Sequence, residues 1–390
     1  MARLGDLFLH IRNGANIKQG LDNAGYPITR IETISNRTVD RNKMGYAGIT
    51  DLEIYSDFVM QDGDILMSHI NSETHLGKTA LYEKEGDEII IHGMNLLSLR
   101  PNKDLITSKY AFYYLSSQSF LRQIPNITKK SVNQASFTVS ALKELVFPLM
   151  SIEKQKKITV DLDKVNDLIS LRKQQLSKLD ELVKSRFIEM FGDPIYNERC
   201  WLIDSVENVC SDIYGGGTPS KAHPEYYENG DIPWVSSKDM KASILYDSQI
   251  RINQLGVENS TAKIVPINSV IMVIRSGILK HTLPVAINAV PITVNQDLKV
   301  FVPSQRITSF FLMYLFKMLE KDILSGVRAV TADNIEFNSL KERMIIVPPI
   351  DLQLEFVTFV EQTDKSKFEI QKSLEKLETL KKALMQKYFG

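Results

Sequence analysis

The side chains that could do chemistry in this sequence lie in loop-like stretches and are of types that hydrogen-bond to nucleic-acid bases and phosphates. Arginine and lysine can bridge guanine acceptors or contact phosphate, and asparagine and glutamine can pair with adenine. Any one of these residues alone fits an ordinary polar loop better, so the prediction concerns the set. The set predicted to contact DNA comprises Lys18, Gln19, Arg30, Asn36, Arg37, Arg41, His69, Asn71, Lys78, Lys129, Lys130 and Asn133 in the first half, and Gly216, Thr218, Ser220, Lys221, Trp234, Ser236, Lys238, Arg275, Lys280, His281 and Arg328 in the second.

Motifs for catalysis or cofactor binding are missing from the sequence. An enzyme that methylates a flipped adenine would carry an Asn/Asp-Pro-Pro-aromatic loop, whereas the one Asp-Pro pair here continues into Ile195. Gly77-Lys78-Thr79 resembles the end of a phosphate-binding loop, but Ser72 occupies the place of its first glycine. The six histidines form no metal-ligand pattern. We therefore expect no catalytic residue, no metal and no cofactor on this chain.

The chain contains a long internal repeat. The segment LKELVFPLMSIEKQKKI begins at Leu142, and LKERMIIVPPIDLQLEFV begins at Leu340. From Gln155 and Gln353 to the final glycines of MFG and YFG, the offset between matching residues stays at 198. An ungapped match of this length indicates a true duplication. The predicted order is a variable block (1–150), a helix (151–192), a second variable block (193–349) and a second helix (350–390).

Each repeat predicts one long helix with a coiled-coil seam. Apolar residues recur at alternating steps of three and four, and neither segment contains proline or glycine before its final glycine, where a helix cap is expected. Two helices of about 38 residues, roughly 55 Å each, predict an antiparallel pair within the chain. Dimerisation of two chains through the same seam is the alternative. The predicted seam is Leu162, Val165, Ile169, Leu176, Leu179 and Val183 in the first copy, and Ile370, Leu374, Leu377 and Leu384 in the second.

The two variable blocks predict α+β globular domains. Short β-branched runs bounded by turn residues predict strands at residues 64–68, 88–92 and 270–274. One helical segment is expected in each block, at residues 108–123 and 307–319. The predicted fold class is therefore α+β, with two globular domains joined by two long antiparallel helices in a pseudo-twofold repeat.

Bulk composition restricts how such a chain could bind DNA. The 390 residues include 47 basic and 47 acidic residues, so the formal net charge is zero, and 43% of residues are hydrophobic. A protein that bound DNA only through a diffuse positive surface would normally be more basic than this, so any DNA contact is expected to come from local patches. No apolar stretch is long enough for a membrane span or a secretory signal, and the two cysteines are typical of a reducing compartment, so a cytoplasmic location is expected.

Several of these landmarks resemble the specificity subunits of Type I restriction-modification systems. They are GGGTPS from Gly215, GDIPWVSSKDM from Gly230 to Met240, and the duplicated helix whose first copy ends in MFGDP. The resemblance in layout, two variable blocks alternating with two helices, covers the whole chain. The first block shows only the looser patterns DGDILMS and GMNLLSLRP, so its resemblance rests mainly on position.

The resemblance implies that each block is a target-recognition domain for one half of a split DNA target, and that the helices set the gap between the halves. It also implies a non-catalytic subunit that serves defence against foreign DNA and binds double-stranded DNA together with partner subunits. Two modification subunits would use S-adenosylmethionine to methylate adenine, and restriction subunits would use ATP; no membrane partner is implied. A coiled-coil interaction scaffold that does not read DNA is the alternative.

Overall fold

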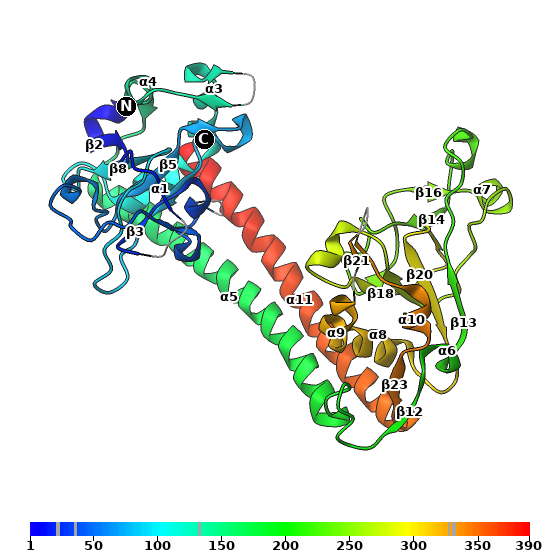
Figure 1. The fold of residues 1–390 in the computed structure, drawn as a ribbon. Coiled ribbons are helices and arrows are strands. Elements are labelled where there is room, and N and C mark those ends of the chain that lie inside the picture. The colour runs from blue at the N-terminus through cyan, green and yellow to red at the C-terminus, as the bar shows by residue number, and fades with distance from the viewer. Residues whose placement is uncertain (21–23, 35–36, 132–133, 327, 330–332) are drawn as a thin grey trace. The chain divides into compact units, whose positions relative to one another are not determined.

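The computed structural model describes residues 1–20, 24–34, 37–131, 134–326, 328–329 and 333–390. Contacts divide the chain into two compact units, of which unit 1 contains Met1–Lys173 and Lys372–Gly390, and unit 2 contains Gln174–Gln371. Each unit therefore combines one globular block with one half of each long helix, which the ribbon shows in green and in orange to red (Figure 1). The domain boundaries predicted from the sequence repeat stay predictions. The two units are defined by contacts between residues, and they divide both long helices.

The block of unit 1 is built on a four-stranded antiparallel sheet. The order is β2–β8–β5–β7, with strands Phe8–Asn13, Leu96–Pro101, Ile65–Ser68 and Thr79–Leu81. All four residues of β5 are buried, as expected for a central apolar strand. Helix α1 (Ser108–Leu115) packs beside β7, and its aromatic residues enter the core. The shorter elements are β1 Ala2–Arg3, β3 Pro27–Ile28, β4 Gly45–Tyr46, β6 Ile70–Asn71, α2 Gln118–Leu121, α3 Ile124–Ile127, β9 Lys129–Lys130, β10 Ala135–Ser136, α4 Val139–Lys143 and β11 Val146–Phe147.

The block of unit 2 repeats this plan with additions. Its main sheet has the order β13–β20–β17–β18–β15, with strands Cys210–Gly215, Leu298–Pro303, Val270–Val273, Val285–Asn288 and Ile244–Leu245. The first four strands correspond to β2, β8, β5 and β7, and α8 (Ser309–Met318) corresponds to α1. The remaining elements are β12 Leu202–Ser205, α6 Val206–Val209, β14 Ile232–Val235, β16 Arg251–Ile252, α7 Gln254–Glu258, β19 Thr293–Val294, α9 Glu320–Ser325, β21 Arg328–Ala329, β22 Asp333–Asn334, α10 Phe337–Lys341 and β23 Met344–Val347.

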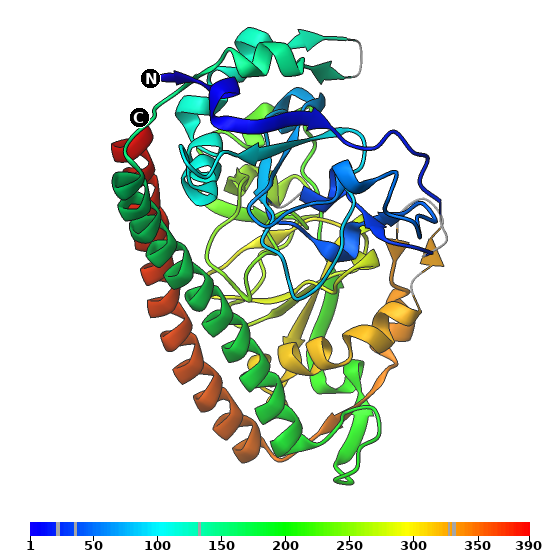
Figure 2. The same ribbon diagram turned by 90° about the vertical axis from the view of Figure 1, so that its left-hand side faces the viewer.

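The two repeats form the long helices α5 (Ile152–Phe191) and α11 (Ile350–Phe389), each of 40 residues. They run side by side in opposite directions (Figures 1 and 2). In unit 1 the Tyr388 hydroxyl donates to Asp161 over 2.7 Å. In unit 2 the Lys367 ammonium lies 2.7 Å from Asp180. The predicted antiparallel pairing within one chain is therefore confirmed.

The structure places all ten predicted seam residues on the covered side of their helices. Leu162, Val165, Ile169, Val183 and Leu374 are buried, and the other five are half-buried. Charged residues lie alongside this seam, as in the ion pair between Lys173 and Glu378 in unit 1. Burial of the apolar stripe, rather than helix propensity alone, stabilises helices of this length.

The last phenylalanine of each helix closes the core of one unit. Phe389 of α11 lies with its ring centroid 5.4 Å from that of Tyr110 in unit 1. Phe191 of α5 lies 4.8 Å from Phe311 in unit 2. Gly192 follows Phe191 with a φ of 76°, a left-handed conformation that favours glycine and ends the helix as the sequence predicts.

Two local predictions differ from the structure. The predicted strand at residues 88–92 is wrong, because Ile91 forms only isolated bridges, to Ile28 of β3 and to Val59. The predicted helix at residues 108–123 is broken after Leu115, where Ser117 caps a separate short helix by accepting a hydrogen bond from the Phe120 amide. The strand at residues 88–92 was predicted because an apolar segment buried by loops has the same sequence pattern as a buried strand.

Candidate nucleic-acid interface

A glycine-bounded loop leaves the first strand of the main sheet in each unit. In unit 1 the amide of Ala15 donates to the His92 carbonyl over 2.8 Å, directly after Gly14. In unit 2 the amide of Gly217 donates to the Val294 carbonyl over 2.9 Å. A side chain at Gly14 or at the equivalent Gly216 would collide with the backbone of the neighbouring segment, so the close approach requires glycine. Predicted residues from both blocks therefore sit on equivalent loops.

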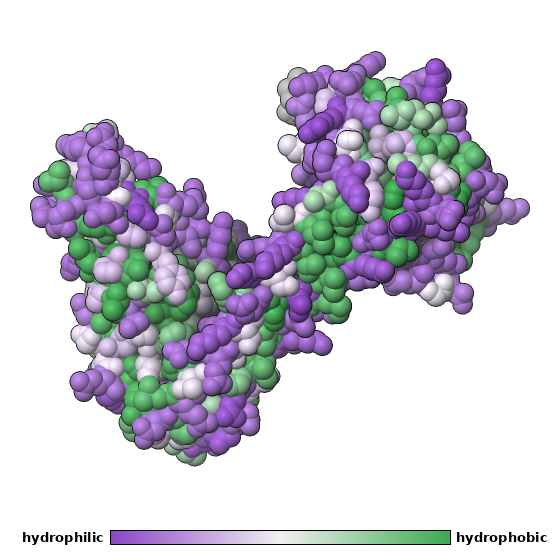
Figure 3. Space-filling view, turned by 180° about the vertical axis from the view of Figure 1, so that it is seen from behind, coloured by the Kyte–Doolittle hydropathy of each residue, from purple (hydrophilic) through white to green (hydrophobic). Residues whose placement is uncertain are grey.

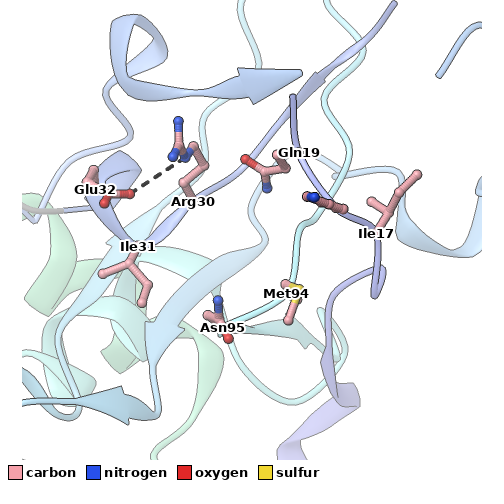
Figure 4. A pocket seen from close by; sticks show the side chains of 8 residues that line it. Ile17, Gln19, Arg30, Ile31, Glu32, Met94 and Asn95 are labelled. Atoms are coloured by element: carbon pink, nitrogen blue, oxygen red, sulfur yellow. Dashed lines mark ion pairs between the residues drawn. The ribbon is translucent and has the colours of Figure 1, made fainter. Parts of the chain in front are cut away.

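In unit 1 this loop borders an open hollow of about 320 Å³. Lys18, Gln19 and Arg30 line it together with Asn95, whose φ is 74°. The Gln19 side-chain nitrogen donates to the Thr29 carbonyl over 3.3 Å, and its side-chain oxygen is buried without a hydrogen-bond partner among the described residues. Figure 4 shows these side chains with Glu32, which pairs with Arg30 at 3.8 Å. The hollow presents both hydrogen-bond donors and acceptors, which base edges require.

In unit 2 the equivalent loop is held more firmly. The Tyr227 hydroxyl donates to the Pro219 carbonyl over 2.6 Å, and the Trp234 indole donates to the Gly217 carbonyl over 2.9 Å. The Thr218 hydroxyl hydrogen-bonds to the side chain of Gln296. Ser220, Lys221 and Lys238 are exposed, and Ser236 is half-buried and donates to Asp239 over 2.7 Å. The exposed side chains on this loop are Thr218, Ser220 and Lys221, and Lys238 lies after strand β14.

A small strand cluster unites predicted residues that are far apart in the sequence of unit 1. Strand β10 pairs with both β6 and β9, which places Asn71, Lys129 and Lys130 on one three-stranded sheet. Both lysines are exposed, and the Lys130 ammonium lies 2.6 Å from Glu73. A neighbouring hollow of about 200 Å³ is lined by Arg37 and Lys78, among others.

Unit 2 has a corresponding strand pair. Strand β21 pairs with β22, and Asn334 of β22 forms a bridge to Arg275. The Arg275 guanidinium donates to Asp297 over 2.7 Å and is half-exposed. Lys280 and His281 are exposed at the end of the turn that starts at Gly277 and lies against β22. Each unit thus has a short strand pair beside its main sheet, and in unit 2 the exposed Lys280 and His281 lie near that pair.

Three predicted contacts have other roles in the structure. The Arg41 guanidinium donates to both Glu88 oxygens over 2.8 and 2.6 Å, and this hydrogen bonding lowers the pKa of Glu88 to about 2. His69 and Trp234 are only 6% and 7% exposed, so their side chains pack in the interior and cannot reach DNA as placed. Asn36 and Asn133 lie outside the described residues, and only the backbone of Arg328 is described.

Two buried histidines of unit 1 predict a stability that depends on pH. Burial lowers the pKa of His69 to about 4 and that of His92 to about 3, whereas an unfolded histidine titrates near 6.5. The unfolded state therefore binds more protons below pH 6.5, so stability is complete above that pH and falls as the pH decreases toward 4. At pH 5 each histidine is expected to lower the free energy of unfolding by about 2 kcal/mol.

Urea unfolding at pH 7.5 and pH 5.0 measures this difference. Replacing His69 with glutamine should remove about a third of this histidine-dependent change, because burial also lowers the pKa of His10 to about 4. Replacing the exposed His281 should leave the change intact. Equal pH dependence in both variants would contradict the assignment of the effect to burial.

Sequence reasoning missed two residues that border these loops, Asn95 and Gln296. Both precede an equivalent strand, since β8 begins at Leu96 and β20 at Leu298. Aligning the segment GMNLL with NQDLK, so that Leu96 matches Leu298, would have placed both residues next to the glycine loops.

Within the described ranges, no group of three or more His, Cys, Asp or Glu residues could hold a metal ion, and no helix is long and apolar enough to cross a membrane.

Comparison with known proteins identifies the family. The model of the Type I restriction modification DNA specificity domain matches residues 1–181 and 205–382. A Methanocaldococcus jannaschii protein that bears the name of the type I restriction enzyme MjaX specificity subunit is 30% identical, over 98% of this chain and 90% of its own. The EcoR124I/EcoR124II specificity subunit of Escherichia coli is 37% identical over 39% of this chain and 38% of its own.

A solved structure of the Type-I restriction-modification system S subunit from M. genitalium has the same fold. Its TM-score is 0.58 at 14% sequence identity, and the match covers 100% of this chain and 95% of that one. The duplicated helices, the two blocks with equivalent loops and these matches agree with one another. The chain belongs to the family of Type I restriction modification DNA specificity proteins.

Proposed function

We propose that this chain selects a split DNA target, with the block of each unit reading one half. The observation that carries the proposal is the equivalence of the loops: two blocks with different side chains place them at the same two positions of a shared fold. The first position is the glycine loop, which begins at Gly14 in unit 1 and at Gly216 in unit 2. The second is the strand pair, β9–β10 in unit 1 and β21–β22 in unit 2. A repeated scaffold with different loop residues favours reading two different sequences.

The chemistry of the loops supports direct readout combined with phosphate contact. The hollow of unit 1 offers Lys18, Arg30 and Asn95, which match the edges of guanine and adenine. The exposed Lys129 and Lys130, and Lys221 in unit 2, suit phosphate contact. Because the chain has zero formal net charge, these few cations cannot supply high affinity alone, so partner subunits would have to add contacts.

The proposed partners are two modification subunits and, for cleavage, restriction subunits. S-adenosylmethionine and ATP would bind to those partners and not to this chain, which would act in the cytoplasm. Apolar side chains are exposed on the surface of the long helices, among other places (Figure 3). In unit 1 they include Leu168, Leu171 and Leu380, each between 44% and 54% exposed. Leu182 of α5 and Leu380 of α11 are equivalent in the repeat and similarly exposed, which supports one partner docking on each half.

Exchange of one block tests the proposal. Residues 1–150 are replaced by the corresponding block of a relative, and the sequence methylated by the assembled complex is mapped. We expect one half of the methylated target to change, with the other half unchanged. A complex in which both halves change, or in which neither changes, would contradict independent reading and would favour a scaffold role.

A single lysine provides a further prediction. Lys129→Ala should weaken binding to all duplexes about equally, and should reduce the slope of log affinity against log salt by about 1, because one phosphate contact is lost. Fluorescence anisotropy of the complex on cognate and random duplexes at several salt concentrations measures both quantities.

The matched control is Lys84→Ala, which removes an exposed lysine from a loop outside the proposed interface of unit 1. This variant should keep the original affinity and salt slope. If the two variants behave alike, the strand pair β9–β10 does not contact phosphate.

A further inference from the structure

Two buried glutamines occupy equivalent positions near the start of the long helices. Gln155 of α5 and Gln353 of α11 are 198 residues apart, and both are 0% exposed. The Gln155 oxygen accepts from the Thr107 amide over 2.8 Å, and its nitrogen donates to the carbonyls of Leu105 and Met150 over 2.9 Å each. Both donors and one acceptor position of the side-chain amide are thereby used.

Gln353 makes the same three kinds of contact in unit 2. Its oxygen accepts from the Thr308 amide over 2.8 Å. Its nitrogen donates to the carbonyl of Arg306 over 3.1 Å and to that of Pro348 over 2.9 Å. The block residues differ between the two units, yet this junction is built identically.

Each glutamine joins three backbone segments. The first is the N-cap of the helix that attaches the block to the long helices, which is α1 in unit 1 and α8 in unit 2. The N-cap residues are Thr107 and Thr308, and the hydroxyl of each also caps its helix. The second is the segment that leads into the long helix, and the third is the long helix itself. One buried amide therefore links the N-terminus of the attaching helix to the start of the long helix in each unit.

The opposite end of the attaching helix is also held, in a different way. In unit 1 the Tyr113 hydroxyl donates to Asp163 and accepts from the Asn166 amide over 2.7 Å. In unit 2 Tyr314 packs edge-on against Phe356 with ring centroids 5.4 Å apart. These contacts differ between the units, whereas the glutamine contacts are the same in both, as is the packing of Phe389 and Phe191 on the attaching helices. The glutamines supply the polar contacts that the two junctions share.

We propose that Gln155 and Gln353 are positioning residues that hold each recognition block at one orientation on its helices, and so restrict the chain to targets with one spacing between half-sites. The inference rests on the proposed function. An apolar residue could fill the same volume without desolvating an amide, whereas a buried and fully bonded polar group specifies one arrangement. Loss of the three hydrogen bonds would let the attaching helix adopt several angles, and targets with altered spacing would then be accepted.

The test uses the complex with modification subunits and a set of duplexes whose half-sites are constant and whose spacer varies by one base pair. Gln155→Met keeps the length of the side chain and removes its hydrogen bonds. We expect the preference for the original spacer over spacers one base pair longer or shorter to fall about tenfold, with unchanged base preference in both half-sites. Gln353→Met should act in the same way from unit 2, which covers the case in which one variant fails to fold.

The control is a core variant with an equal loss of melting temperature that does not touch the junction, such as Ile65→Ala in the buried strand β5. It should lower total activity and keep the spacer preference. If the methionine variants also keep the spacer preference, the glutamines have only a stabilising role and the inference is wrong. If the unaltered complex itself shows no preference among targets, the proposed function fails instead.

Discussion

Replacing Phe389 with alanine is expected to lower the free energy of unfolding of unit 1 by about 3–5 kcal/mol, although this residue is the last but one in the chain. Its side chain is 5% exposed, and its ring lies 5.4 Å from Tyr110 and 5.8 Å from Tyr114. Both tyrosines belong to α1, so the end of the sequence completes the core that the first block begins. Truncation to alanine would leave a cavity between rings that cannot collapse onto it.

The control lies on the same helix. Phe368 of α11 is 66% exposed, and Phe368→Ala should change the free energy of unfolding by no more than about 0.5 kcal/mol. Hydrogen exchange in α1 under increasing urea would report on unit 1 directly, and the Phe389 variant should expose these amides at lower denaturant. If the two variants protect α1 equally, the C-terminal segment does not stabilise the first block.

The long helices could be predicted from the sequence because their determinants are local and repeated. The heptad spacing of Leu162, Val165 and Ile169 requires a covered stripe wherever the partner lies. The offset of 198 then identifies a second helix with the same requirement, and the two can cover each other within one chain. Gln155 and Gln353 marked the repeat in the sequence, but their hydrogen bonds to the blocks could not be predicted, since their partners are 45 to 50 residues away.

The candidate interface could be predicted only as a set of residue types. Asn71 and Lys130 share one small sheet because each pairs with the same strand, and no local pattern in the sequence indicates that pairing. Arg41 has the composition of a DNA contact, yet it binds Glu88, which is 47 residues away. A side chain's type shows what it can bind, and only the fold shows whether another residue already binds it.

Burial could not be assigned from composition either. Trp234 stands in a polar stretch that resembles a recognition loop, but it is buried and donates to the Gly217 carbonyl. It positions the loop that carries Thr218, which is exposed. That the stretch belongs to a DNA-binding site stays a prediction, while the role of its largest side chain differs from the predicted one.

A second large effect is expected at Asp64, which the sequence shows only as part of a turn before a strand. Its carboxylate is buried at 1% exposure and accepts two hydrogen bonds of 2.8 Å from the Arg100 guanidinium. It also accepts from the Gln61 amide over 2.8 Å, which closes the turn. Asp64→Ala should lower the free energy of unfolding of unit 1 by about 3–5 kcal/mol, because it leaves a largely covered guanidinium without its partner.

Three variants separate the charge effect from simple loss of a side chain. Asp104→Ala removes an exposed carboxylate from the turn after β8, the strand that carries Arg100, and should change stability by no more than about 0.5 kcal/mol. The double variant Asp64→Ala/Arg100→Leu should be more stable than Asp64→Ala alone, since no unpaired charge remains in the core. A double variant that is less stable than the single one would show that Arg100 stabilises the sheet by packing rather than by its pairing with Asp64.

Unit 2 shows why this charged pair is a property of one block and not of the shared fold. At the equivalent turn, the Ser269 amide donates to the buried Asn288 side chain over 2.9 Å, and the Ser269 hydroxyl donates to the Pro266 carbonyl over 2.8 Å. The same turn is therefore closed by neutral groups, which carry no penalty for a buried charge. Substitution of Asp64 should destabilise the first block alone, and hydrogen exchange in α8 should stay unchanged in the Asp64→Ala variant.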